Sequence, residues 1–351
     1  MSEWTRTTLD QLVKLRRGHD LPTTSRNPGN VPVVGAAGPS GFHDTAIAKA
    51  PGVVVGRAGA SMGHATYCAE DFWPLNTSLY VTDFMGNDPR FVYHLLGEID
   101  FSGYNSGAAQ PMLNRNYITQ IPISLPEPDE QRAIAAVLGA LDDKIVVNER
   151  IVAAAMELGA AKAAQVSASA MESAVLGDIL ELKYGKSLPA ARRVAGEIPV
   201  FGSGGISGTH IEALLEGPGI IVGRKGTVGS VYWSEGGFFP IDTTFYVVCR
   251  GNGVSMEYAY FLLKGLGLEE MNSDSAVPGL NRDRALSVRI KVPDAHSIQR
   301  FTVEARELFA MSRVREQENQ TLATLRDTLL PQLMSGRIRV KDAEKIVEDH
   351  V

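Results

Sequence analysis

The chain has 351 residues, 44% of them hydrophobic, and a formal net charge of −6. Its length suggests two or three domains. The acidic balance argues against a nucleic-acid-binding protein, although charge is not uniform along the chain and basic residues cluster locally. Two cysteines, Cys68 and Cys249, are too few for a disulfide framework. We find neither an apolar run of the ~18 residues that a membrane span needs nor a signal-peptide pattern, and therefore expect a cytoplasmic protein.

A pattern of glycines and prolines occurs twice in the chain. The distance along the sequence from each residue of the first occurrence to its counterpart in the second is the same as the distance from Pro32 to Pro199. Glycines at fixed spacing mark backbone positions that need a positive φ or a close approach. The pattern therefore predicts one fold duplicated in tandem. The first set is Pro32, Gly35, Gly38, Gly41, Gly52, Gly56, Arg57, Gly59, Pro111, Leu113 and Asn114; the second is Pro199, Gly202, Gly205, Gly208, Gly219, Gly223, Arg224, Gly226, Pro278, Leu280 and Asn281.

Each copy is predicted to begin with a short helix, at 9–15 and 176–182, and to continue as short strands between Gly- and Pro-rich turns. A second short helix is expected at 89–96 and 256–263. The expected strands are 31–34, 53–55 and 79–81 in the first copy, and 198–201, 220–222 and 245–248 in the second.

A long helix is predicted after each copy, from 129 to about 170 and from 295 to about 330. In the first, apolar residues at heptad spacing include Ile134 and Leu141, Asn148 lies on the same seam, and Asp129 is a candidate N-cap. The helices could each pack on their own domain, but their length favours a mutual antiparallel coiled coil.

The predicted fold class is therefore α+β: two irregular β-rich domains, each followed by a long helix, arranged with pseudo-twofold symmetry. The expected segments are domain 1 at 1–128, a central helical spacer at 129–172, domain 2 at 173–294, a C-terminal helical spacer at 295–336 and a tail at 337–351.

Several catalytic motifs are only partly present. The segment 59–63 matches G-x-S-x-G, but a strand rather than the required helix is expected after it, and the second copy lacks the serine. Gly185-Lys186-Ser187 lacks the upstream glycine of a phosphate loop. The seven histidines lack metal-ligand spacing. We therefore expect a chain without catalytic residues, bound metal or directly bound cofactor.

Three duplicated or ordered motifs resemble the specificity subunit of type I restriction–modification enzymes. They are the glycine-rich segments 198–205 and 221–229, the segment Ser275-Ala276-Val277-Pro278-Gly279-Leu280-Asn281-Arg282, and the spacer segments 130–135, 141–145 and 325–336. The second spacer opens without the Glu130-Gln131 pair of the first. The resemblance covers nearly the whole chain.

The resemblance implies that each repeat is a target-recognition domain for one half of a split, asymmetric site in double-stranded DNA. It also implies that two modification (methyltransferase) subunits, which carry S-adenosylmethionine, dock on the helices and that a restriction (motor nuclease) subunit joins them. Residues of the helix motifs are then candidates for the partner-subunit interface: Glu130, Gln131, Ile134, Leu141, Leu325, Leu329 and Leu330.

Cations and amides at equivalent places in the copies are candidates for DNA contact, because Arg and Asn pair bidentately with guanine and adenine and basic side chains bind phosphate. They are Arg57, Arg224, Lys225, Asn114, Arg115, Asn281 and Arg282 near the turns, and Lys14, Arg16, Arg17, Lys183 and Lys186 near the start of each copy. For each of them a solvated surface or turn role is the alternative. For the chain, the alternative is a coiled-coil scaffold with two protein- or peptide-binding β domains and no DNA role.

Overall fold

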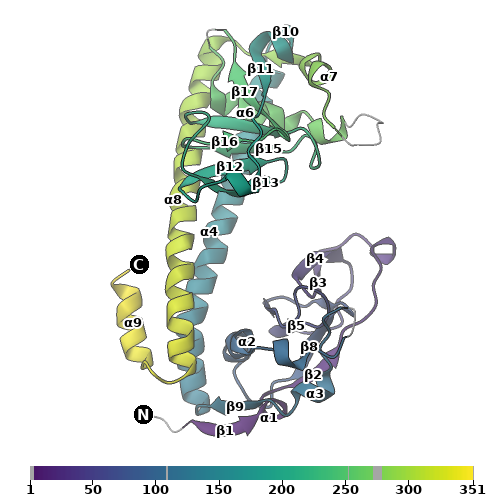
Figure 1. The fold of residues 1–351 in the computed structure, drawn as a ribbon, viewed down its shortest axis with the longest axis vertical. Helices are drawn as coiled ribbons and strands as arrows, with labels where there is room; N and C mark the ends of the chain where they lie inside the picture. Colours follow the sequence, from purple (N-terminus) through teal and green to yellow (C-terminus); the bar gives the residue numbers. More distant parts are fainter. Residues whose placement is uncertain (1–3, 108–109, 252, 272–278, 351) are drawn as a thin grey trace. The chain divides into compact units, whose positions relative to one another are not determined.

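The computed structural model describes residues 4–107, 110–251, 253–271 and 279–350. It divides into two compact units (Figure 1), the first formed by Met1–Val147 with Glu318–Val351 and the second by Asn148–Gln317. Each unit contains one copy of the repeat together with a segment of both long helices.

The described residues of the first repeat form three small sheets and three α-helices. A four-stranded sheet has the order β2-β8-β5-β6, a three-stranded sheet has the order β4-β3-β7, and β1 pairs with β9. The elements are β1 (Thr5–Thr8), α1 (Leu9–Leu12), β2 (Lys14–Arg17), β3 (Val31–Gly35), β4 (Gly38–His43), β5 (Gly52–Gly56), β6 (Ala65–Cys68), β7 (Trp73–Pro74), β8 (Ser78–Asp83), α2 (Pro89–Glu98), α3 (Arg115–Ile118) and β9 (Pro122–Leu125).

The repeat of the second unit has the same sheets, in the orders β11-β17-β14-β15, β13-β12-β16 and β10-β18. The elements are β10 (Glu172–Val175), α5 (Leu176–Ile179), β11 (Leu180–Tyr184), β12 (Ile198–Gly202), β13 (Gly205–His210), β14 (Gly219–Gly223), β15 (Val231–Ser234), β16 (Phe239–Pro240), β17 (Thr244–Cys249), α6 (Met256–Gly265), α7 (Arg282–Leu286) and β18 (Arg289–Val292). The predicted strands and the predicted duplication are confirmed.

The offset between the copies is not constant, although the glycine pattern had suggested that it is. Most elements of the second copy follow their counterparts at the offset of Pro32 to Pro199, but β15, β16 and β17 begin one residue earlier than that offset places them. The second copy therefore has one residue fewer before β15 and one more before α6. The matched glycines lie on either side of this region. The loss of one residue followed by the gain of one residue leaves the offset between them unchanged, so the glycines do not reveal either change.

The glycine pattern does identify the backbone geometry that it predicts. Gly59 and Gly226 have φ values of +81° and +85°, a region that favours glycine. Gly56 lies in the same turn, and an added Cβ there would be 2.0 Å from the carbonyl oxygen of Ser61; at Gly223 it would be 2.1 Å from that of Thr227. Both copies therefore need glycine at these two points of the turn.

The short helix that opens each copy is shorter than predicted. Helix α1 ends at Leu12 and α5 at Ile179, and the next residues form strands instead. Lys14–Arg17 pairs antiparallel with β8, and Leu180–Tyr184 pairs with β17. A partner strand that lies far along the sequence decides this conformation, which explains why the local helical pattern was misleading.

The two long helices are α4 (Pro128–Ala168) and α8 (Ala295–Met334). Within the first unit, Asp142 of α4 pairs with Arg326 of α8 at 2.8 Å, and Lys144 pairs with Glu318 at 3.2 Å. Later residues of α4 thus meet earlier residues of α8, so these segments run antiparallel. Asp129 lies in the first turn of α4 rather than before it. None of the helices in the described residues is long and apolar enough to span a membrane.

A single hydrophobic cluster joins the helices to the first repeat. It contains Leu138 of α4, Leu329 of α8 and Phe91 of α2, and the C-terminal helix α9 (Val340–Glu348) adds Ala343. Trp4 lies beside Gly336, because an added Cβ there would be 2.9 Å from its Nε1. The residue before β1 and the segment after α8 therefore meet in the first unit.

Candidate nucleic-acid interface

Arginines from separate parts of the first repeat surround one hollow of about 340 Å³. Arg16 and Arg17 come from β2, Arg57 from the turn after β5, and Arg115 from the start of α3. Among the described residues that line the hollow, none is acidic. The lining is Arg16, Arg17, Arg57, Leu79, Ser106, Met112, Leu113, Asn114 and Arg115.

Backbone hydrogen bonds fix Arg57 at this hollow. Its N–H donates to the carbonyl of Thr77 at 2.9 Å, and its own carbonyl accepts from Leu113 at 2.8 Å. Its guanidinium lies 3.4 Å from the carbonyl of Asn76 and 3.2 Å from the sulfur of Met112. The sheet and the later loop therefore both hold this arginine, and the residue is half-buried.

The second repeat uses the same backbone framework at Arg224. Its N–H donates to the carbonyl of Thr243 at 2.9 Å and its carbonyl accepts from Leu280 at 2.9 Å. Its Nη1 donates to the carbonyl of Asp242 at 3.0 Å, as that of Arg57 does to the carbonyl of Asn76. The side chains differ in their other neighbour, because the guanidinium carbon of Arg224 lies 4.9 Å from the centre of the Tyr184 ring.

Tyr184 connects two of the predicted cations. The guanidinium of Arg282 lies 5.6 Å from the same ring centre, so two guanidinium groups contact one aromatic ring. Such contacts contribute about 0.5–1 kcal/mol each at exposed sites. Tyr184 is 52% exposed. It was not among the predicted site residues, although its position corresponds to Arg17 of the first copy.

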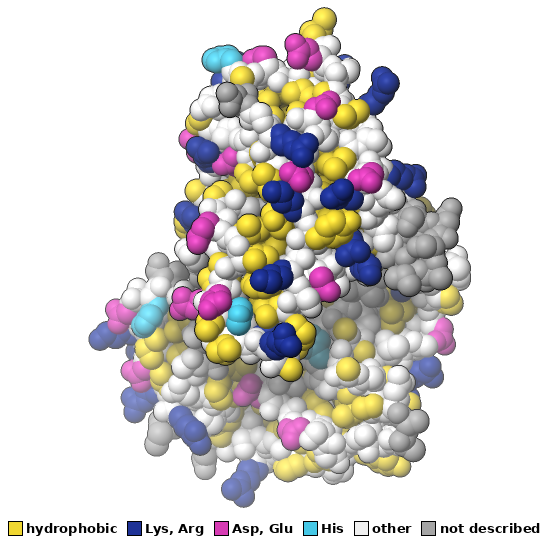
Figure 2. Space-filling model, turned by 45° about the horizontal axis from the view of Figure 1, so that its top comes forward, with side chains coloured by type: hydrophobic (Ala, Val, Ile, Leu, Met, Phe, Trp, Pro, Cys, Tyr) yellow, Lys and Arg dark blue, Asp and Glu magenta, His cyan; other side chains and the backbone are white. Residues whose placement is uncertain are grey.

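The remaining predicted cations are placed less centrally. The ammonium of Lys14 donates to the carbonyl of Asp10 at 2.7 Å, outside the hollow. That of Lys183 is 3.9 Å from the carboxylate of Glu181. Lys186 and Lys225 are exposed. In the view of Figure 2, basic side chains are interspersed with acidic ones, in agreement with the net charge.

The two predicted asparagines, one in each copy, both cap a short helix. Asn114 caps α3, its side chain accepting from the N–H of Asn116 at 3.0 Å, and Asn281 caps α7 by accepting from the N–H of Arg284 at 3.0 Å. An amide oxygen used in this way is poorly available for bidentate pairing with adenine. The preceding motif residues Ser275, Ala276, Val277 and Pro278 lie outside the described residues.

Most residues predicted for the partner-subunit interface are buried inside the chain itself. Ile134, Leu141, Leu325 and Leu329 belong to the first hydrophobic cluster. Gln131 is 2% exposed, and its side chain bonds the backbone of Asp88 and Pro126. Glu130 and Leu330 are half-buried. The heptad seam thus packs against the chain's own second helix, and of the predicted interface residues Glu130 and Leu330 keep exposed surface.

The serine of the partial hydrolase motif has no nucleophile elbow around it. Strand β6 begins at Ala65, shortly after the motif, whereas an elbow requires a helix there. Burial also raises the pKa of Cys68 to about 12 and that of Cys249 to about 11, so both remain protonated thiols at neutral pH. Neither the serine nor the cysteines form a nucleophilic site.

Two copies of one α+β fold, each with a cationic site at the same place, define a tandem-repeat protein with one candidate recognition site per copy. The family model described as the type I restriction modification DNA specificity domain matches the chain twice, over residues 1–155 and 169–322. The chain therefore belongs to the type I restriction–modification DNA specificity family.

Individual relatives agree with this assignment. The Escherichia coli type I restriction enzyme EcoprrI specificity subunit is 27% identical over 124 residues, which are 34% of this chain and 31% of that protein. The match thus spans about a third of the relative's length. A crystal structure of the type-I restriction-modification system S subunit from M. genitalium has a similar fold, with a TM-score of 0.62 and 22% identity over 95% of this chain and 96% of that one.

Proposed function

We propose that the chain is the non-catalytic specificity subunit of a type I restriction–modification enzyme and acts in the cytoplasm. Each repeat would read one part of a two-part, asymmetric DNA sequence. The observation that carries the proposal is the placement of a backbone-fixed arginine, Arg57 or Arg224, at the same turn of both copies. Its surroundings differ, and different surroundings suit two different half-sites.

The first site is suited to phosphate and guanine because it gathers arginines without a neighbouring acid among the residues that line it. The second places two guanidinium groups in contact with one exposed tyrosine ring. An exposed aromatic ring offers an apolar surface for a thymine methyl group or a sugar, so Tyr184 joins Arg224 and Arg282 as a candidate reader. Asn114 and Asn281 become secondary candidates because they cap helices.

The partner subunits would dock on exposed apolar side chains of the long helices rather than on the buried heptad seam. Val147 of α4 and Val314 of α8 are at equivalent positions and are 47% and 53% exposed. Exposed apolar side chains mark a binding surface when they are contiguous, and here Val146, 43% exposed, is next to Val147, while Met311, 38% exposed, is one helical turn before Val314. These two valines are candidates for contact with the two modification subunits, which would supply S-adenosylmethionine and the methyl-transfer chemistry.

The test is the affinity of the purified chain for a random-sequence duplex of about 30 base pairs at several salt concentrations. Phosphate contacts release counterions, so log K should fall with log salt with a slope of about −0.9 per contact. Several contacts per domain predict a steep slope that becomes shallower in the Arg16→Ala/Arg17→Ala variant. A flat dependence would instead favour a scaffold that binds protein or peptide.

A further inference from the structure

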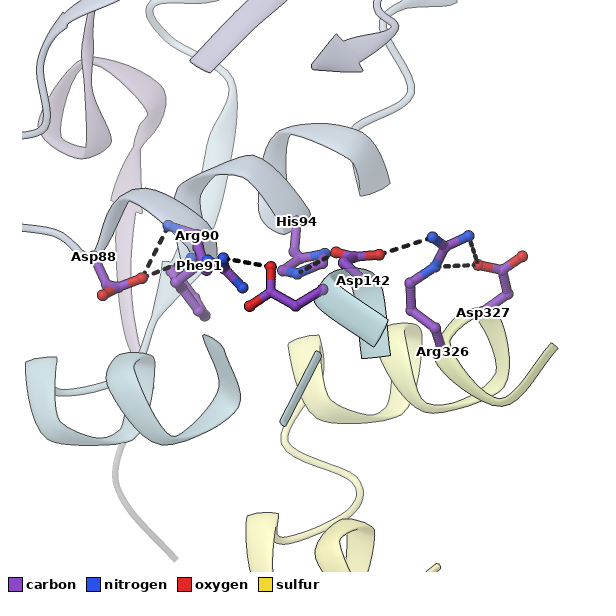
Figure 3. A network of polar contacts seen from close by, with 8 residues as sticks. Asp88, Arg90, Phe91, His94, Asp142, Arg326 and Asp327 are labelled. Carbon is purple, nitrogen blue, oxygen red and sulfur yellow. Dashed lines mark hydrogen bonds and ion pairs between the residues drawn. The ribbon is translucent and has the colours of Figure 1, made fainter. Parts of the chain in front are cut away.

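The contact between each recognition domain and the long helices differs between the two copies. In the first unit, His94 of α2 faces Asp142 of α4, with 3.5 Å between Nε2 and Oδ2 (Figure 3). The other carboxylate oxygen of Asp142 accepts from Arg326 of α8 at 2.8 Å. The two helices and the domain thus meet in one polar chain.

His94 is buried, at 4% exposure, and is neutral at physiological pH. Desolvation lowers its pKa to about 4 and outweighs the opposing effect of Asp142. Arg326 and Arg90 act in the same direction as burial, whereas Asp88 opposes it. The carboxylate of Asp142 consequently depends on Arg326 for its charge partner.

The second unit has an aromatic contact at the equivalent place. Phe261 corresponds to His94, Phe309 to Asp142 and Gly159 to Arg326, each at the offset that relates the two copies. The rings of Phe261 and Phe309 lie 5.6 Å apart. An added Cβ at Gly159 would be 2.3 Å from the ring of Phe261, so the long helix needs a glycine there.

A second ion pair at this contact has its charges reversed between the units, and its partner on the long helices comes from a different position. Arg90 of α2 donates to Asp143 of α4 at 2.7 Å. In the second unit, Glu257 corresponds to Arg90 and accepts from Arg306 of α8 at 2.7 Å. Arg306 in turn corresponds to Gly139, which lies directly beside Arg90. Each domain helix therefore carries the charge that its own long helices complement.

We propose that these contacts form a docking code that assigns each recognition domain to its own position on the helices. The domain side of the code is Arg90 and His94 in the first copy and Glu257 and Phe261 in the second. The helix side is Gly139, Asp142, Asp143 and Arg326 in the first unit and Arg306, Phe309, Ala310 and Gly159 in the second. The proposal does not depend on the function in DNA recognition.

A domain in the wrong position would meet unfavourable partners at both contacts. The second domain placed on the first position would put Glu257 beside Asp143, and Phe261 against the ion pair of Asp142. The first domain placed on the second position would put Arg90 beside Arg306. Like charges repel, and a buried charge without its partner is strongly destabilising.

The first experiment uses the full-length chain and thermal unfolding. The single change Asp142→Phe should lower the unfolding midpoint by on the order of 10 °C, because it removes the carboxylate that Arg326 contacts on the other long helix. Adding His94→Phe and Arg326→Gly converts the polar contact into the aromatic one and should restore most of the loss. The pair His94→Phe/Arg326→Gly, which leaves Asp142 unpartnered, should remain destabilised. A triple variant no more stable than the single one would overturn the proposal.

The second experiment exchanges a domain. In a full-length chain whose residues 1–127 are replaced by residues 168–294, the copy at the first position should be cleaved by protease at least about ten times faster than the natural domain. Adding Gly139→Arg, Asp142→Phe, Asp143→Ala and Arg326→Gly should restore resistance. If the unmodified exchange is as resistant as the natural chain, the domains are interchangeable and no code exists.

Discussion

Replacement of Arg224 by alanine should relax the reading of one half of the DNA site and leave the other half intact. The structural cost is small. The change removes two cation–π contacts, with Tyr184 and Phe245, about 0.5–1 kcal/mol each, and one hydrogen bond to the carbonyl of Asp242, about 0.5–1.5 kcal/mol. The loss of stability should therefore stay below about 3.5 kcal/mol. A lost base contact costs about 1–3 kcal/mol in binding, or about 5–150-fold.

The assay is selection of bound sequences from a random duplex library by the purified natural and variant chains. Arg224→Ala should flatten the base preference at one or two positions of one half-motif, and Arg57→Ala should do so in the opposite half. Arg300→Ala, which removes a cation from α8, should leave both halves unchanged. If either recognition variant flattens both halves while the chain stays folded, the two domains do not read DNA independently. If neither alters the motif, the arginines are only turn residues.

Three further predictions concern stability and assembly. Because the pKa of His94 is lowered in the folded chain, the unfolded chain binds the proton more readily. Chemical denaturation of the natural chain should therefore show a loss of about 2 kcal/mol of stability from pH 7 to pH 5, and the His94→Gln variant should not show this loss. An identical pH dependence in the two chains would contradict the burial argument. Gly159→Ala should destabilise the chain by about 1–3 kcal/mol, because the new methyl group meets a buried ring. At the control position Gly97 an added methyl group faces open space, so Gly97→Ala should be neutral or stabilising by up to about 1 kcal/mol. Equal thermal unfolding of the two variants would refute the packing argument. Val147→Asp and Val314→Asp should weaken binding of modification subunits by at least about tenfold with unchanged unfolding, and unimpaired co-purification would exclude these valines from the interface.

The features that the sequence predicts well are those that depend on local backbone geometry. Gly59 and Gly226 recur because a positive φ at this turn excludes most other residues. The long helices were predictable because apolar residues at helical spacing continue without proline over 129–170 and 295–330. The second helix continues beyond its predicted end, through Pro331 to Met334. The duplication is recognisable from the same local signals, because both copies adopt the same backbone conformation at equivalent positions.

The features that the sequence predicts poorly depend on which distant segment lies opposite. Leu15 fits an apolar helical pattern, yet it belongs to a strand because β8 is available to pair with it. Ile134 and Leu325 form an apolar seam, and the pattern alone does not say whether the chain or a partner subunit covers it. Tyr184 was missed because aromatic residues at strand ends are common, and only the fold brings Arg224 and Arg282 to its ring.

The most direct test of the central claim is a map of methylated bases in the genome of a strain that carries this gene, compared with the same strain after its deletion. Recognition by two domains predicts a motif of two short, different sequences separated by a fixed number of unspecified bases, which disappears on deletion. Complementation with the Arg57→Ala variant should restore a motif that is relaxed in one part only. An unchanged methylation map after deletion, or a single uninterrupted motif that depends on the gene, would contradict the account.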